Sequence, residues 1–100
     1  MNHIQLQTKF KKKLLQHLGS RLYLYYKIPD CKGVGGLRPF DSFLVYRGKF
    51  FAIEFKVGRD KLKKHQEYFL NLAVLSGGKS LVITDKDNID DVIIKEVINC

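Results

Sequence analysis

Apolar residues recur at every fourth position near the start of the chain, as they do along one face of an amphipathic helix. The stripe consists of Leu6, Phe10, Leu14 and Leu18. It predicts a helix from about residue 3 to Gly19, where the glycine ends it. Over residues 21–28 the side chains alternate in character, which predicts a strand. Residues 29–37, with three glycines, are expected to form a loop.

Two segments rich in aromatic and β-branched residues follow, at 40–46 and 50–57. Only Arg47-Gly48-Lys49 separates them, and this spacing predicts a β-hairpin. If the loop is Arg47-Gly48, Asp41 faces Glu54 across the hairpin, and if it is Gly48-Lys49, Asp41 faces Lys56. A three-residue loop with a bulge would shift this count.

The pattern after the hairpin predicts a helix, a short strand and a last helix. Asp60 is suited to cap a helix that runs to about Leu75. Residues 80–84 are an apolar run typical of a strand, and Asp87 or Asn88 begins the final helix. The element order is therefore αβββαβα, an α/β fold class of the α+β type.

Length and composition allow one domain, residues 1–100, with 45% apolar residues. No apolar run approaches the ~18 residues needed to cross a bilayer, and no signal-peptide stretch is present. We therefore expect a cytoplasmic protein with no membrane partner. The two cysteines are predicted to be free thiols, and no spacing of histidines and cysteines suits zinc.

The net charge of +8 is unevenly distributed along the chain. Residues 1–64 carry +11, whereas residues 65–100 carry −3. Such a basic region favours a polyanionic partner, and nucleic acid is the commonest. An anionic membrane surface, or no such partner at all, is the alternative.

Polar side chains interrupt the apolar hairpin on one face. Because side chains alternate along a strand, Glu54 and Lys56 share a face opposite Phe55, and Asp41 of the neighbouring strand projects on the same side. Two carboxylates this close repel each other, and a divalent cation such as Mg²⁺ would relieve the conflict. The alternative is a plain strand with a solvated outer face and a weak Glu–Lys ion pair.

The helix after the hairpin adds a glutamine to this picture. Gln66 falls within the apolar face that Phe69 and Leu70 define, so its amide needs hydrogen-bond partners there. Either backbone groups satisfy the amide, or it reaches into the polar cluster of the hairpin.

Together these residues resemble the PD-(D/E)XK nuclease superfamily. The match is Pro39-Phe40-Asp41, one residue looser than the Pro-Asp pair of that pattern, then Glu54-Phe55-Lys56, then Gln66. Runs 35–41 and 62–66 are most similar to the small stand-alone VRR-NUC (virus-type replication-repair nuclease) branch. The similarity covers roughly residues 3–84. It implies a restriction-endonuclease-like αβββαβ core with a mixed sheet flanked by helices, here followed by an extra C-terminal helix.

The resemblance also implies roles for these residues. Asp41 and Glu54 would bind Mg²⁺ or Mn²⁺ together with the Phe55 carbonyl. Lys56 would orient or deprotonate the water nucleophile, and Gln66 would position water or phosphate. No organic cofactor is implied. Members of this branch usually carry a glutamate on the first helix, yet residues 1–29 contain no acidic side chain. Gln7 lies near the centre of the apolar stripe and is the candidate for that place, although an amide is a poorer ligand for a hard cation.

Two basic clusters are predicted to contact phosphates. The candidates are Lys11, Lys12, Lys13, Arg38, Arg59, Lys61, Lys63 and Lys64. The resemblance implies a metal-dependent endonuclease for DNA, in particular for branched or four-way (Holliday) junctions, of phage or mobile-element type. Homodimers are common among such nucleases, and the broad apolar face of the last helix suits one. The rival hypothesis is a nuclease-fold protein that binds nucleic acid with weak or no turnover.

Overall fold

The computed structural model describes residues 1–29 and 38–100, so most of the predicted glycine-rich loop lies outside the described residues. The elements in order are α1 (His3–Leu18), β1 (Tyr23–Lys27), β2 (Ser42–Tyr46), β3 (Lys49–Lys56), α2 (Lys64–Leu75), β4 (Lys79–Thr84), α3 (Ile89–Val92) and a π-helical continuation, η1 (Ile93–Ile98). This is the predicted order αβββαβα, with the extra C-terminal helix in place.

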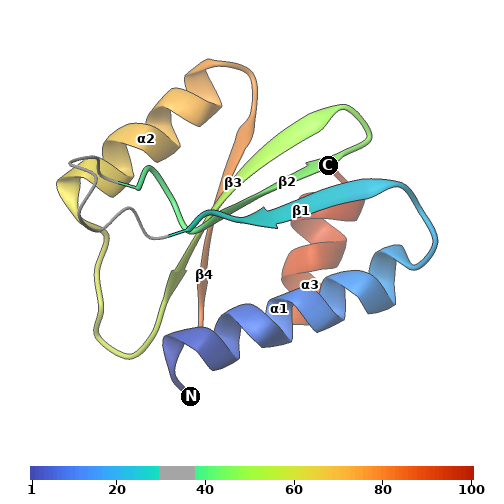
Figure 1. Ribbon diagram of the computed structural model, residues 1–100, viewed down its shortest axis with the longest axis horizontal. Helices are drawn as coiled ribbons and strands as arrows, with labels where there is room; N and C mark the ends of the chain where they lie inside the picture. The colour runs from blue at the N-terminus through green and yellow to red at the C-terminus, as the bar shows by residue number, and fades with distance from the viewer. Residues whose placement is uncertain (30–37) are drawn as a thin grey trace.

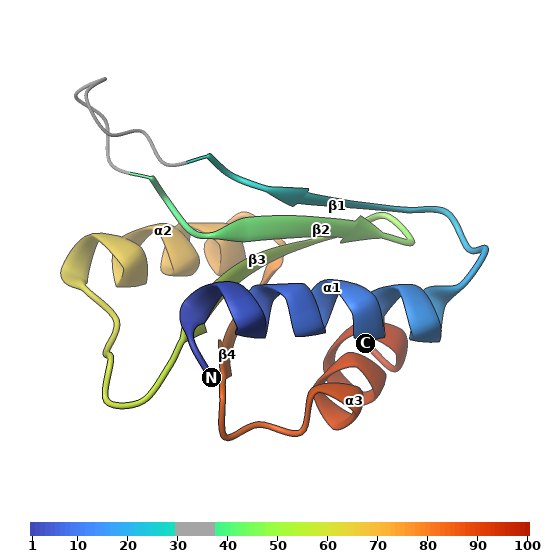
Figure 2. The same cartoon turned by 60° about the horizontal axis from the view of Figure 1, so that its bottom comes forward.

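The four strands form one mixed sheet in the order β1-β2-β3-β4. The pairs β1–β2 and β2–β3 are antiparallel, and β4 runs parallel to β3. Helices α1 and α3 lie together on one side of the sheet, and α2 covers the other face near β3 and β4 (Figures 1 and 2). A parallel pair needs a crossover, and α2 is that crossover.

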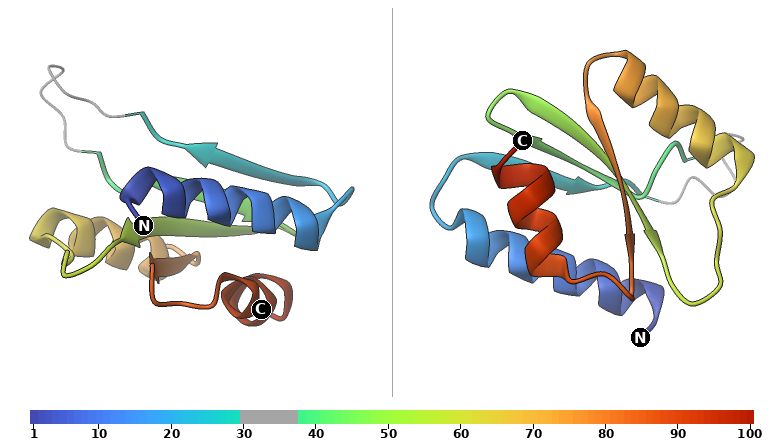
Figure 3. Two further views of the ribbon diagram at one scale, coloured as in Figure 1. Left: turned by 90° about the horizontal axis from the view of Figure 1, so that it is seen from below. Right: turned by 180° about the vertical axis from the view of Figure 1, so that it is seen from behind.

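The apolar stripe of α1 is buried, as predicted. Its members are Leu6, Phe10, Leu14 and Leu18, none of them more than 2% exposed. Phe10 packs edge-on against Phe55 of β3, with ring centroids 5.6 Å apart. The C-terminal helix lies beside α1 and completes this core (Figure 3).

A two-residue turn sets the register of the hairpin. Tyr46 pairs with Lys49, so Arg47-Gly48 is the loop. Both residues have positive φ, 52° and 77°, as the tight turns favoured in hairpins require. Continuing the observed pairing of Ser42 with Ile53 places Asp41 opposite Glu54, so the first of the two predicted registers is confirmed.

The start of α2 differs from the prediction. The helix begins at Lys64, and Asp60 does not cap it. The Gln66 side-chain oxygen accepts a hydrogen bond from the backbone N–H of Lys63 at 2.9 Å, which satisfies a donor at the helix start. Asp60 instead lies 3.6 Å from the Lys56 ammonium.

The strand β1 is also shorter than predicted, and two of its three tyrosines face the core. Tyr23 and Tyr25 pack partly against the core, whereas Leu24 and Tyr26 are half exposed on the opposite face. Burial raises the pKa of Tyr25, whose hydroxyl donates to Ser42 at 3.0 Å.

Asn88, the second of the two predicted caps, caps the last helix, which begins at Ile89. The Asn88 side chain accepts from the Asp91 N–H at 3.1 Å. Ile89, Ile93 and Val97 are buried, while Ile94 is 39% exposed. The broad apolar face is thus used largely within this chain. In the described residues, no helix is long and apolar enough to span a membrane.

Candidate active site

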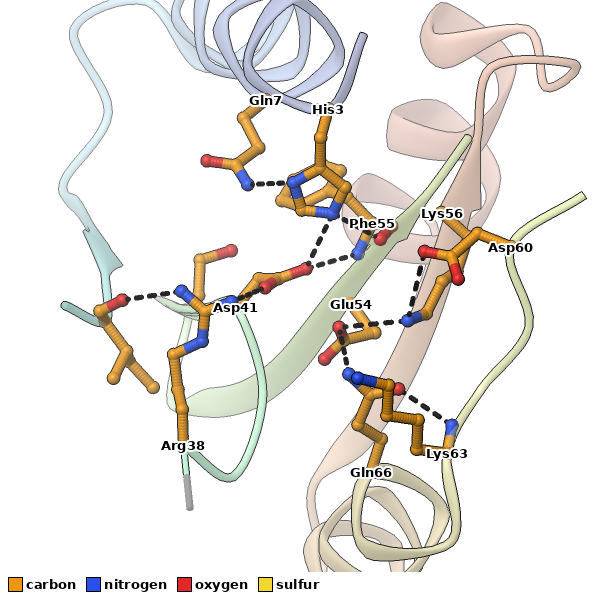
Figure 4. A network of polar contacts seen from close by, with 12 residues as sticks. His3, Gln7, Arg38, Asp41, Glu54, Phe55, Lys56, Asp60, Lys63 and Gln66 are labelled. Carbon is orange, nitrogen blue, oxygen red and sulfur yellow. Dashed lines mark hydrogen bonds and ion pairs between the residues drawn. The ribbon is translucent and has the colours of Figure 1, made fainter. Parts of the chain in front are cut away.

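Three polar side chains meet where β2 begins and β3 ends, as the hairpin pattern predicted. Asp41 is 1% exposed, Glu54 2% and Lys56 6%, so this cluster is buried and is not a solvated strand face (Figure 4). Burying two carboxylates costs free energy unless each gains partners.

The Asp41 side chain takes a backbone hydrogen bond from β3 just beyond the last backbone pair of the β2–β3 hairpin. One carboxylate oxygen, Oδ2, accepts from the Phe55 N–H at 2.8 Å, and the other, Oδ1, lies 2.6 Å from the Arg38 guanidinium. The backbone of β3 therefore fixes the position of the carboxylate. Arg38, predicted to contact nucleic acid, supplies the charge that neutralises Asp41.

Glu54 is less well satisfied than Asp41. Its Oε1 accepts from the Gln66 amide at 3.0 Å and lies 3.8 Å from the Lys56 ammonium. Among the described residues, its buried Oε2 has no hydrogen-bond partner. Burial and then repulsion from Asp41 raise the pKa of Glu54 to about 8, although Lys56 and Arg38 act in the opposite direction.

Gln66 occupies the place that the sharper sequence hypothesis gave it. Its amide nitrogen donates to Glu54, while its oxygen accepts from the Lys63 N–H (Figure 4). The same side chain thus begins α2 and orients a carboxylate. Lys56 lies between Glu54 and Asp60, with its side chain only 7% exposed.

The first helix contributes a residue that the sequence analysis missed. His3 places Nε2 2.7 Å from the Phe55 carbonyl oxygen and 3.5 Å from Asp41 Oδ2. Gln7 is buried, as predicted, but its amide contacts His3 Nδ1 at 2.9 Å. The signal in the sequence that could have identified His3 is its spacing of four residues from Gln7, because residues i and i+4 share a helix face.

The donors at this point suit a hard divalent cation. The orphaned Glu54 oxygen, the Asp41 carboxylate and the Phe55 carbonyl are the oxygen ligands that Mg²⁺ and Mn²⁺ take. Within residues 1–29 and 38–100, no three side chains of His, Cys, Asp or Glu form a metal-binding group. An ion held here would therefore rely on few protein ligands and complete its shell with water or substrate oxygens, as Mg²⁺ commonly does.

Some of the predicted phosphate-binding residues are already paired with acidic side chains of the protein. Lys13 forms an ion pair with Asp90 at 3.2 Å. Lys11 is exposed and lines, with Gln7 and Tyr26, a groove of about 420 Å³ between α1 and β1. Apart from Arg38, the remaining candidates are exposed. Lys12 lies on α1. The others lie between the end of β3 and the first turn of α2, and they are Arg59, Lys61, Lys63 and Lys64.

The mixed sheet, the helices on its two faces and the polar cluster at the end of the hairpin define the restriction-endonuclease-like class of folds. No family model and no curated protein sequence matches the chain. A solved structure described as a "VRR_NUC domain" superposes with a TM-score of 0.61, covering 87% of this chain and 92% of that one at 18% identity. The chain therefore has the VRR-NUC-like fold, as the sequence predicted.

Proposed function

We propose that this protein is a divalent-metal-dependent nuclease that hydrolyses phosphodiester bonds in DNA. The observation that carries the proposal is the buried convergence of Asp41, Glu54 and Lys56, with one Glu54 oxygen unpartnered among the described residues. A buried acidic pair with a spare oxygen is stabilised by a cation. The likeness to a VRR_NUC domain supports the proposal at the level of the fold.

Each residue of the cluster has a distinct task in this proposal. Asp41, Glu54 and the Phe55 carbonyl hold the ion, which when bound lowers the pKa of a water and stabilises charge on a phosphate. Lys56, an ammonium group near Glu54 and Asp60, orients the attacking water and stabilises the charge that develops on the phosphate. Gln66 keeps Glu54 in place through the 3.0 Å hydrogen bond.

The proposed substrate is DNA, in particular branched or four-way-junction DNA, cut by a homodimer. The basic side chains on α1 and between β3 and α2 support a polyanionic substrate, since they are exposed. Two active sites in a dimer would match the two strands of a duplex or junction.

Labelled duplex, flap and four-way-junction DNA incubated with the protein test this proposal. We expect cleavage with Mg²⁺ or Mn²⁺ and none with a chelator, with faster cleavage of the branched substrates. Absence of cleavage on every substrate with either ion contradicts the nuclease proposal. Equal rates on duplex and junction contradict only the preference for branched DNA.

A second candidate function is nucleic-acid binding without turnover. It is favoured by the absence of an acidic side chain in residues 1–29 and by Arg38, which already neutralises Asp41. Tight binding to DNA without cleavage under all conditions would support this alternative.

Both functions predict DNA binding that weakens with salt. The logarithm of the association constant should fall linearly with the logarithm of salt concentration, with a slope of about −0.9 for each phosphate neutralised on duplex DNA. Replacing both Lys11 and Lys12 by alanine should reduce the magnitude of the slope by about 2, because each lysine neutralises about one phosphate. Fluorescence anisotropy titrations at several salt concentrations measure it.

The control for this experiment is Lys95→Ala, an exposed lysine on the C-terminal helix. Its slope should equal that of the unmodified protein. A slope that stays constant in the Lys11/Lys12 variant would remove these residues from the DNA interface.

A further inference from the structure

The His3 imidazole is held against two atoms of the candidate metal site by specific contacts. Nε2 is 2.7 Å from the Phe55 carbonyl oxygen and 3.5 Å from Asp41 Oδ2, and the side chain is 34% exposed. The ring meets the Phe55 ring edge to face, with centroids 6.4 Å apart. Figure 4 shows the ring directed from α1 toward the Asp41 carboxylate and the strand β3.

These separations fit neighbouring positions around one ion. In an octahedral shell with metal–ligand bonds of about 2.1 Å, adjacent ligand atoms lie about 3 Å apart. The distances of 2.7 and 3.5 Å from Nε2 bracket that value. We propose that His3 is a direct ligand of the bound divalent ion, next to Asp41 and the Phe55 carbonyl. Because no three His, Cys, Asp or Glu side chains of the described residues form one metal-binding group, Glu54 would then reach this ion through a bound water. This inference rests on the proposed function, because it concerns the same ion.

Gln7 can stabilise the His3 tautomer that metal binding requires, which carries its proton on Nδ1 and leaves Nε2 free for the ion. As placed, the Gln7 amide nitrogen donates to Nδ1, which leaves the proton on Nε2 to be donated to the Phe55 carbonyl. To ligate an ion, Nε2 must give up that proton to solvent while Nδ1 takes one. The Gln7 amide, rotated by half a turn, then accepts from Nδ1–H through its oxygen. A hydrogen bond to the other ring nitrogen is the usual support of a metal-binding histidine.

An imidazole ligand changes which ions the site prefers. Oxygen ligands suit Mg²⁺, whereas imidazole nitrogen suits first-row transition ions. The site is therefore expected to bind Mn²⁺ in preference to Mg²⁺, and part of that preference should depend on His3.

Pulsed electron paramagnetic resonance of the Mn²⁺-loaded protein tests this inference directly. Mn²⁺ bound to an imidazole shows nitrogen modulation in the echo decay, and we expect it in the unmodified protein. The modulation should be absent from His3→Gln and retained in His17→Gln. His17 lies further along α1 than His3, and its ring pairs with Asp90 of α3. The third histidine, His65, provides a second control as His65→Gln.

Calorimetry supplies a second measurement. His3→Gln should weaken Mn²⁺ binding by at least about tenfold and Mg²⁺ binding by less, and Gln7→Leu should weaken Mn²⁺ binding by about tenfold. Binding of one Mn²⁺ without nitrogen modulation overturns the role of His3 and leaves the nuclease proposal intact. Failure of the unmodified protein to bind either ion overturns both. The unmodified protein alone decides the spectroscopic result, so loss of fold in a variant does not remove the test.

Discussion

Lys56→Met should cleave DNA at least about 100-fold more slowly than the unmodified protein while still binding DNA and remaining folded. A positioned donor or charge that stabilises charge developing in the transition state contributes about 10² to 10³ in rate. The Lys56 ammonium lies 3.8 Å from Glu54 and 3.6 Å from Asp60, so it is the cationic side chain that β3 presents to the acidic residues of the site. Single-turnover cleavage at saturating protein measures the chemical step.

Three measurements separate this effect from damage to the fold. Thermal unfolding and DNA affinity of Lys56→Met should remain close to those of the unmodified protein. Lys95→Met, on the exposed side of the C-terminal helix, should cleave at the normal rate. Asp41→Asn should also lose cleavage, because the amide removes a charge from the ion site. Normal cleavage by Lys56→Met would contradict the role assigned to this residue.

In the presence of a chelator, the folded protein should lose stability as the pH rises from about 5 to 8. The pKa of Glu54 is raised from its ordinary value of 4.5 to about 8, so in this window the folded state holds a proton that the unfolded state has released. Stability falls with pH wherever the folded state binds more protons. At about 1.4 kcal/mol for each pKa unit, the loss is about 2 to 5 kcal/mol in the free energy of unfolding. Urea denaturation at several pH values measures it.

Glu54→Gln should remove this pH dependence. The amide carries no charge but keeps an oxygen that accepts the Gln66 hydrogen bond, so above pH 7 the variant should be more stable than the unmodified protein without metal. Adding Mn²⁺ should narrow this difference in the free energy of unfolding, because an ion at a hundred times its dissociation constant stabilises the unmodified protein by about 2.7 kcal/mol. Glu67→Gln, at an exposed position of α2, is the matched control and should keep the pH dependence. A flat pH profile in the unmodified protein would contradict the raised pKa.

Local patterns were sufficient for the elements and for most of the cluster. The period of two in the hairpin put Glu54 and Lys56 on one face, and the period of 3.6 put Gln66 on the inner face of its helix. Both predictions are confirmed, because side-chain direction follows directly from the backbone period. The helix start at Asp60 was wrong because a hydrogen bond between Gln66 and the Lys63 backbone competes with the capping signal.

The sequence by itself determined the order of elements, the buried stripe of α1 and the face on which the acidic pair lies. Only the tertiary structure decided which turn joins the hairpin, and so that Asp41 lies opposite Glu54. It also brought His3 to Phe55, 52 residues further along the chain, and buried Glu54 beside Asp41 so that its pKa rises. The physical reason is that a backbone period fixes the direction of a side chain, whereas contact between distant segments and removal from water depend on how the helices pack on the sheet.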